Sequence, residues 1–184
     1  MHYLQIFSLF VATVASTGFT IPSDQPNGVY TVTYDAEGRA IHTLIGSPVN
    51  HTEGSPNPLV SRSPNKLSLL ARQADAVHCG GYDLNRPNTD NAVEALKNQC
   101  SPGAIGGNLN FYSISGSTVA YVCNYNGAAV ACTRNEIGES ADRITGVCGS
   151  YRAGWRNLVR DGRNIQIGYE NTGSKFCGRG TLGN

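Results

Sequence analysis

Apolar residues recur at helical spacing in two segments of the second half of the chain. The first segment follows Pro87–Asp90, whose cap-forming and acidic residues open a helix, and it ends before Pro102. The second follows Thr133, which forms a capping box with Glu136, so that each side chain can satisfy a free backbone amide near the other. The inner faces carry Ala92, Val93, Leu96 and Cys100 in the first helix, and Ile137, Ala141, Ile144 and Cys148 in the second.

Other segments have the composition and alternation of β-strands. Residues 109–114 and 119–125 are two such runs, and the turn residues Ser115–Ser117 between them predict a β-hairpin. Asn164–Asn171 predicts a last strand, with an apolar residue at every second position on one side. A short strand near residues 77–82 is an optional addition in front of the first helix.

This order of elements, helix, strand, strand, helix and strand, predicts an α+β fold. We expect both helices on one face of a small antiparallel sheet. Two helices that are joined through a hairpin commonly lie antiparallel, which brings the end of each close to the start of the other. Six cysteines can pair in many ways, and this arrangement favours one of them. The expected pairs are Cys79–Cys148, Cys100–Cys132 and Cys123–Cys177.

The chain in front of the cysteines has a different pattern. Residues 1–16 hold an apolar run that ends in small residues, which predicts a secretory signal peptide. In residues 27–46, side chains alternate between two faces on a strand-like run that leads into the turn Asp35–Gly38, and this pattern predicts a second hairpin. Residues 47–68 are rich in Ser, Pro and Asn and predict an exposed linker, in which Asn50 begins a glycosylation sequon.

Arg72 is a candidate processing site between these two parts. The sequence Leu69–Arg72 resembles the monobasic sites that kexin-type proteases cut in fungal secreted proproteins. The alternative is an uncut, solvated arginine. We therefore divide the chain into a signal peptide (1–16), a propeptide with its linker (17–72) and a disulfide-bonded domain (73–184).

The composition supports this division. Six of the eight prolines lie between residues 17 and 72, and all six cysteines lie after them. An even number of cysteines behind a signal peptide predicts three disulfides in an oxidising compartment, and we expect an extracellular protein with no membrane span. Residues 17–72 have four basic and four acidic residues, and residues 73–184 have ten basic and nine acidic residues. This balance gives no bulk attraction to nucleic acid, so we expect no nucleic-acid partner.

Few residues suggest catalysis. The cysteine-bearing half has a single histidine, His78, which a small hydrolase such as a ribonuclease could use with Glu94, Glu136 or Glu170. Ser140 follows a Gly-Glu pair as in a nucleophile elbow, but it lies within a helix, and we interpret it as a solvated helix residue. The cysteines are too widely spaced for a zinc site. We expect no metal and no cofactor, and we leave catalysis open while favouring a binding protein.

The segment YRAGWRNLVRDGR is the best candidate for a binding surface, because it holds four of the ten basic residues of this half and the only tryptophan. In a helix, three arginines at every fourth position would form one stripe. Arginine beside tryptophan is typical of binding hot spots. The alternative is a connecting loop whose tryptophan fills the core. The candidate binding residues are Arg152, Trp155, Arg156, Arg160 and Arg163.

Four parts of the cysteine-bearing half carry a resemblance to known proteins: ALKNQC, GGNLNFYSISGSTVAYVCNY, ACTRNEI with ITGVCGS, and GRNIQIGYEN. In these parts the chain resembles small secreted fungal cysteine-rich proteins of the killer-toxin-like and necrosis-inducing effector type. The resemblance implies a non-enzymatic protein that acts on cells of another organism, through an unknown protein or cell-surface component of a host or competitor. We expect a monomer. A structural protein of the cell wall or cell surface is a further alternative.

Overall fold

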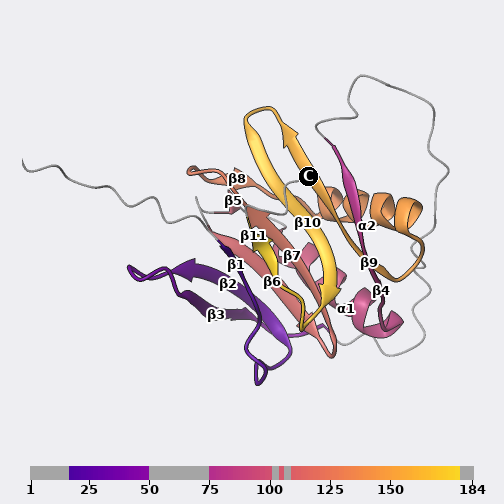
Figure 1. Cartoon of the computed structure of the whole chain (residues 1–184), viewed down its shortest axis with the longest axis horizontal. Coiled ribbons are helices and arrows are strands. Elements are labelled where there is room, and N and C mark those ends of the chain that lie inside the picture. Colours follow the sequence, from indigo (N-terminus) through magenta and orange to yellow (C-terminus); the bar gives the residue numbers. More distant parts are fainter. Residues whose placement is uncertain (1–16, 50–74, 101–103, 106–108, 179–184) are drawn as a thin grey trace, which may run out of the picture.

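The computed structural model describes residues 17–49, 75–100, 104–105 and 109–178. Its main feature is a seven-stranded sheet in which every neighbouring pair is antiparallel (Figure 1). In spatial order the strands are β3 (Ala40–Gly46), β2 (Gly28–Tyr34), β6 (Asn110–Ser115), β7 (Thr118–Asn124), β10 (Arg163–Asn171), β9 (Arg152–Arg160) and β4 (Val77–Asp83). Two short ribbons pair β1 (Thr17–Phe19) with β11 (Phe176–Gly178), and β5 (Ala104–Ile105) with β8 (Val130–Ala131).

Both helices begin at polar caps. In α1 (Arg86–Gln99) the Asn85 side chain accepts a hydrogen bond of 3.1 Å from the backbone amide of Asn88. In α2 (Arg134–Cys148) the Thr133 hydroxyl accepts one of 3.2 Å from the amide of Glu136, as the capping box predicted. The two helices with a largely antiparallel sheet confirm the α+β class.

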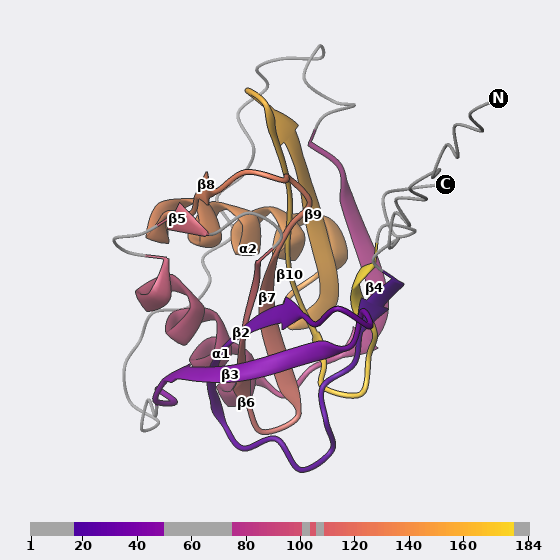
Figure 2. The same cartoon turned by 90° about the vertical axis from the view of Figure 1, so that its left-hand side faces the viewer.

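One hydrophobic core lies between the helices and the sheet. Figure 2 shows α1 and α2 on the same side of the sheet. Ile165, Ile167 and Tyr169, at alternating positions of β10, point into this core, as the alternation predicted. Its other members come from both helices and from neighbouring strands, and include Leu96, Ile137, Ile144, Val122 and Leu158.

A second core covers the opposite face of the sheet. Its buried members are Phe19, Tyr30, Val32, Tyr112, Ile114, Val119, Tyr121, Cys123, Phe176 and Cys177. Phe19 of β1 and Phe176 of β11 lie over this face, with ring centroids 4.8 Å apart. The sheet is therefore covered on both sides.

The N-terminal hairpin belongs to the main sheet. The turn from Asp35 to Gly38 joins β2 and β3, which confirms the hairpin that the alternation predicted. Its sequence predicts a hairpin in a leader and gives no sign that β2 pairs with β6 of the cysteine-bearing half. The described parts on either side of the candidate linker therefore form one sheet.

The arginine-rich segment is a strand, and both the helix and the connecting loop considered for it are wrong. β9 pairs with β10 on one side and with β4 on the other. It is therefore an additional strand between the second helix and the expected last strand. Gly154, a loop signal in the sequence, has a packing role. A Cβ atom there would lie 2.7 Å from the His78 carbonyl oxygen and 3.0 Å from Ile144 of α2, so only glycine fits without a shift.

Three disulfides join these layers, and they are the pairs expected from the sequence. Cys79–Cys148 links β4 to the end of α2, Cys100–Cys132 links the end of α1 to the entry of α2, and Cys123–Cys177 links β7 to β11. The Cα atoms of the pairs are 5.1–5.5 Å apart, within the usual range for disulfides.

Candidate functional site

Two arginines of β9 lie on the face of the sheet that α2 covers. Alternation along the strand puts the side chains of Arg152 and Arg156 on the same side. Arg156 is opposite Ile167 of β10, which belongs to the core beneath the helices. Arg152 and Arg156 thus share a side through strand alternation and not through a helix. The side chain of Arg160 lies outside the described part of the structure.

Arg156 is buried, with only 2% of the residue exposed. Its guanidinium contacts both carboxylate oxygens of Asp75, with Nη2 donating to Oδ2 at 2.7 Å, and its Nη1 donates to the Ser140 hydroxyl at 3.2 Å. Ser140 is itself fully buried, so its interpretation as a solvated residue is wrong, because it faces β9 from the inner side of α2. The guanidinium therefore ties β9 to α2 and to the residues before β4.

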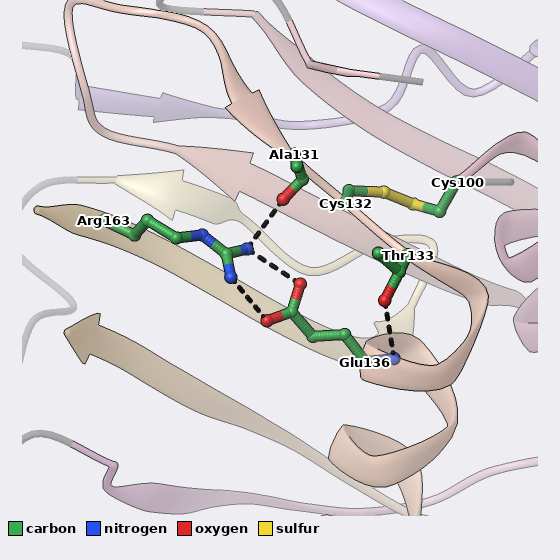
Figure 3. The surroundings of a disulfide bond; sticks show 6 residues. All are labelled: Cys100, Ala131, Cys132, Thr133, Glu136 and Arg163. Atoms are coloured by element: carbon green, nitrogen blue, oxygen red, sulfur yellow. Dashed lines mark hydrogen bonds and ion pairs between the residues drawn. A yellow bond between two sulfur atoms is a disulfide. The ribbon is translucent and has the colours of Figure 1, made fainter. Parts of the chain in front are cut away.

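Arg163 at the start of β10 makes a second link to α2 (Figure 3). Its Nη1 and Nη2 donate to the two oxygens of the Glu136 carboxylate at 2.8 and 2.7 Å, and Nη2 also donates to the Ala131 carbonyl at 2.7 Å. Hydrogen bonding to this carboxylate raises the pKa of the Arg163 guanidinium. The Cys100–Cys132 disulfide lies beside this pair, so crosslink and ion pair fasten the same end of α2.

Arg152 is the most open to solvent of the candidate arginines whose side chains are described. Its side chain is 44% exposed, and it forms a 3.3 Å ion pair with Asp83 of β4, itself 84% exposed. Its Nη2 also donates to the Gly81 carbonyl at 3.2 Å. Tyr82, between these two residues, is 57% exposed. An exposed arginine and an exposed tyrosine therefore lie on adjacent strands at the β4 edge.

Trp155 and His78 lie on the opposite face of the sheet. Their rings are stacked, with centroids 5.5 Å apart and planes at 18°. A row of polar groups continues from there across the sheet. His78 Nε2 is 3.4 Å from the Asn157 amide nitrogen, Gln166 donates to Asn157 at 3.1 Å, and the Tyr125 hydroxyl donates to Gln166 at 3.2 Å. The row joins β4, β9 and β10 to the residue that follows β7.

Asn157 and Gln166 are buried polar residues of this row that were not predicted from the sequence. Gln166 lies between Ile165 and Ile167, which point into the core beneath the helices, so its own side chain points to the opposite face of the sheet. A polar residue at this position of the predicted strand was the signal in the sequence. Trp155 Nε1, next to the row, is buried and has no hydrogen-bond partner among the described residues.

The three glutamates considered for catalysis differ in their surroundings. Glu94 on α1 contacts Arg134 and lies 3.8 Å from Lys97, and Glu136 on α2 is held by an arginine as described above. Glu170 on β10 lies on the face of the sheet that carries His78, by strand alternation. It is 5% exposed, and burial raises the pKa of its carboxyl group, while Ser174 donates a 3.4 Å hydrogen bond to it.

Two sequence-predicted sites lie outside the described residues. They are the processing site at Arg72 and the sequon at Asn50, and the signal peptide is outside as well. These three remain predictions.

Comparison with protein-family models, with curated proteins and with solved structures gave no match. In the described ranges, no three His, Cys, Asp or Glu side chains are grouped as ligands for a metal ion. The described part of the chain also contains no helix with the length and apolarity needed to cross a membrane.

Proposed function

We propose that the protein is a secreted fungal effector or killer-toxin-like protein that acts on cells of another organism by binding. In this proposal a signal peptide exports the chain and a kexin-type protease cuts it after Arg72. The proposal keeps the arrangement expected from the order of elements, with two antiparallel helices over one face of the sheet. The target is a protein or a surface component of a host or competitor cell.

The three disulfides are the observation that supports this proposal most strongly. They fasten both ends of α2 and the second face of the sheet, and such crosslinks persist in oxidising, extracellular surroundings. A body stapled in this way keeps its surface in a fixed shape without a large core. A fixed surface lowers the entropy cost of binding a partner.

The β4 edge is the surface that we propose for target binding. The side chain of Arg152 is 44% exposed there and Tyr82 is 57% exposed, and both residue types are enriched in binding hot spots. Arg156, on the strand next to β4, donates to the Ser140 hydroxyl of α2 and is a positioning residue for this edge in the proposal. Arg163 pairs with Glu136 at the opposite end of the β9–β10 hairpin and lies outside the proposed surface.

The test applies purified protein to plant tissue and to cultures of competing fungi and measures cell death, growth and immune response. We expect a response that is lost when the protein is reduced and alkylated. Arg152→Ser and Tyr82→Ser should weaken the response and leave the urea midpoint of unfolding unchanged. Full activity of the double variant would remove the β4 edge from the proposal, and an inactive wild-type protein in every assay would contradict the function itself.

One observation favours a small hydrolase as a second candidate. His78 and Glu170 share a face of the sheet, and a raised pKa such as that of the Glu170 carboxyl group is typical of an acid catalyst. A ribonuclease activity that His78→Ala and Glu170→Gln both abolish would support this candidate. Absence of RNA cleavage by the folded wild-type protein would exclude a ribonuclease.

A further inference from the structure

The N-terminal segment Thr17–Val49 packs on the cysteine-bearing body, which comprises the described residues from 75 to 178. It contacts this body at both an edge and a face of the sheet. We infer that this segment stays bound after the chain is cut between residues 50 and 74, so that the finished protein is a complex of two chains with no covalent link between them. The inference rests on the proposed function only for the occurrence of the cut. Figures 1 and 2 both show β2 lying against β6.

At the edge, β2 adds a strand to the body. It pairs with β6 in antiparallel register from Gly28, opposite Ile114, to Val32, opposite Asn110. The Asn27 side chain accepts a 2.9 Å hydrogen bond from the amide of Gly116, in the turn between β6 and β7. Removing the segment would leave β6 with an unpaired edge, and unpaired edges readily accept another strand.

At the face, the segment encloses Tyr112 of β6. The ring of Tyr30 stacks on that of Tyr112 at a centroid distance of 5.0 Å, and Phe19 lies at 6.0 Å. His42 Nδ1 is 2.8 Å from the Tyr112 hydroxyl. Together with Phe176 of β11, these three residues of the segment surround Tyr112, which is 0% exposed.

The segment itself contributes buried apolar residues to the interface. Val29, Tyr30, Val32 and Phe19 are each at most 5% exposed. Dissociation would return these side chains to water, together with the apolar residues of β6 that they cover. Because backbone pairing and apolar burial act together here, the contact has the form of strand addition to a sheet edge, a binding mode that needs no covalent link.

No disulfide can hold the segment in place. All six cysteines lie between residues 79 and 177, and they pair with one another. A cut at Arg72, or anywhere else between 50 and 74, therefore leaves the two chains joined only by the contacts described above. The body keeps its three crosslinks in either case.

The experiment uses the exported full chain, in which the recognition sequence of a site-specific protease replaces residues 61–65. Denaturing mass spectrometry confirms the cut, and gel filtration with native mass spectrometry then follows the fragments at micromolar concentration. We expect both fragments in one complex, which separates in urea while the disulfides remain intact. Elution of the N-terminal fragment apart from the body in native buffer would overturn the inference.

Val32→Ala and Thr33→Ala provide a matched pair on β2, because Val32 is 0% exposed and Thr33 is exposed. The urea concentration at which the cut complex separates should fall for Val32→Ala and stay unchanged for Thr33→Ala. Equal values for the two variants would contradict the interface. The mass of the naturally secreted protein tests the cut separately: an uncut chain would refute processing after Arg72 and leave the result with the engineered site unaffected.

Discussion

Replacing Arg156 by methionine removes a charge from beneath α2 and keeps most of the side-chain volume. The residue is 2% exposed, and the Asp75 side chain that it pairs with is 16% exposed. The variant therefore removes the guanidinium contacts of a largely buried carboxylate and one hydrogen bond of the Ser140 hydroxyl. We expect a clear loss of stability, since a buried charge is costly once its partner is removed.

Breaking a buried ion pair by removing one partner costs about 3–5 kcal/mol. Asp75 keeps some access to solvent, so we expect a value near the lower end, about 3 kcal/mol, because water stabilises part of the exposed charge. With a urea dependence of about 2 kcal/mol per molar, the midpoint of unfolding should fall by about 1.5 M. The measurement is urea unfolding of the disulfide-intact protein, followed by circular dichroism.

Arg152→Met is the matched control, because it changes the same residue type on the same strand. Its ion pair with Asp83 is exposed on both sides, and surface pairs of this kind contribute about 0–1 kcal/mol. An Arg156→Met midpoint within error of wild type would refute the assignment of Arg156 as a structural residue. A loss of the same size in Arg152→Met would also contradict the distinction between the two arginines.

Three further predictions concern crosslinks, pH and processing. Replacing both Cys100 and Cys132 by alanine opens a loop whose ends are 32 residues apart, and urea unfolding should show a loss of about 3–4 kcal/mol from the unfolded-chain entropy alone. Burial lowers the pKa of the His42 imidazole below its usual 6.5, so His42 takes up a proton more readily in the unfolded chain than in the folded one. The contribution of His42 to stability is therefore full above about pH 6.5 and falls as the pH drops below that value. His42→Gln should remove this contribution from the difference between the urea midpoints measured at pH 7.5 and pH 5. Intact mass of the secreted protein should show two chains that separate after Arg72 and, in a glycosylating host, a glycan on Asn50 of the first; a single uncut chain that contains residues 17 to 178 would contradict the cut.

The elements that the sequence predicted correctly have local causes. Thr133 caps α2 through the amide of Glu136, three residues away, and the hairpin of β6 and β7 turns at Gly116, which has a φ of 55° that glycine adopts easily. Each signal lies within a few residues of the structure that it specifies. Such signals can be recognised without knowledge of the rest of the fold.

The strand β9 was missed because its residues fit more than one pattern. A spacing of four residues places Arg152 and Arg156 on one side of a helix and equally on one side of a strand. Gly154 suggested a loop, although the close approach of the His78 carbonyl requires glycine there. Only the pairing with β4 and β10 decides between these structures, and that pairing is not visible in the segment itself.

Long sequence separations hid the remaining features. Asp75, the partner of Arg156, is 81 residues away from it in the chain. β2 pairs with β6 across a Ser, Pro and Asn-rich stretch that, read locally, indicates a boundary. The burial of Arg156 and the incorporation of the N-terminal hairpin therefore depend on contacts that local patterns do not encode.

Action by binding, without catalysis, is the central claim, and His78→Phe tests it most directly. Phenylalanine keeps an aromatic ring to stack on Trp155 and removes the one imidazole of the cysteine-bearing half. The measurement is the response of target cells to the variant, beside its urea midpoint. We predict the full wild-type response; a lost response at an unchanged midpoint would contradict the account and favour catalysis.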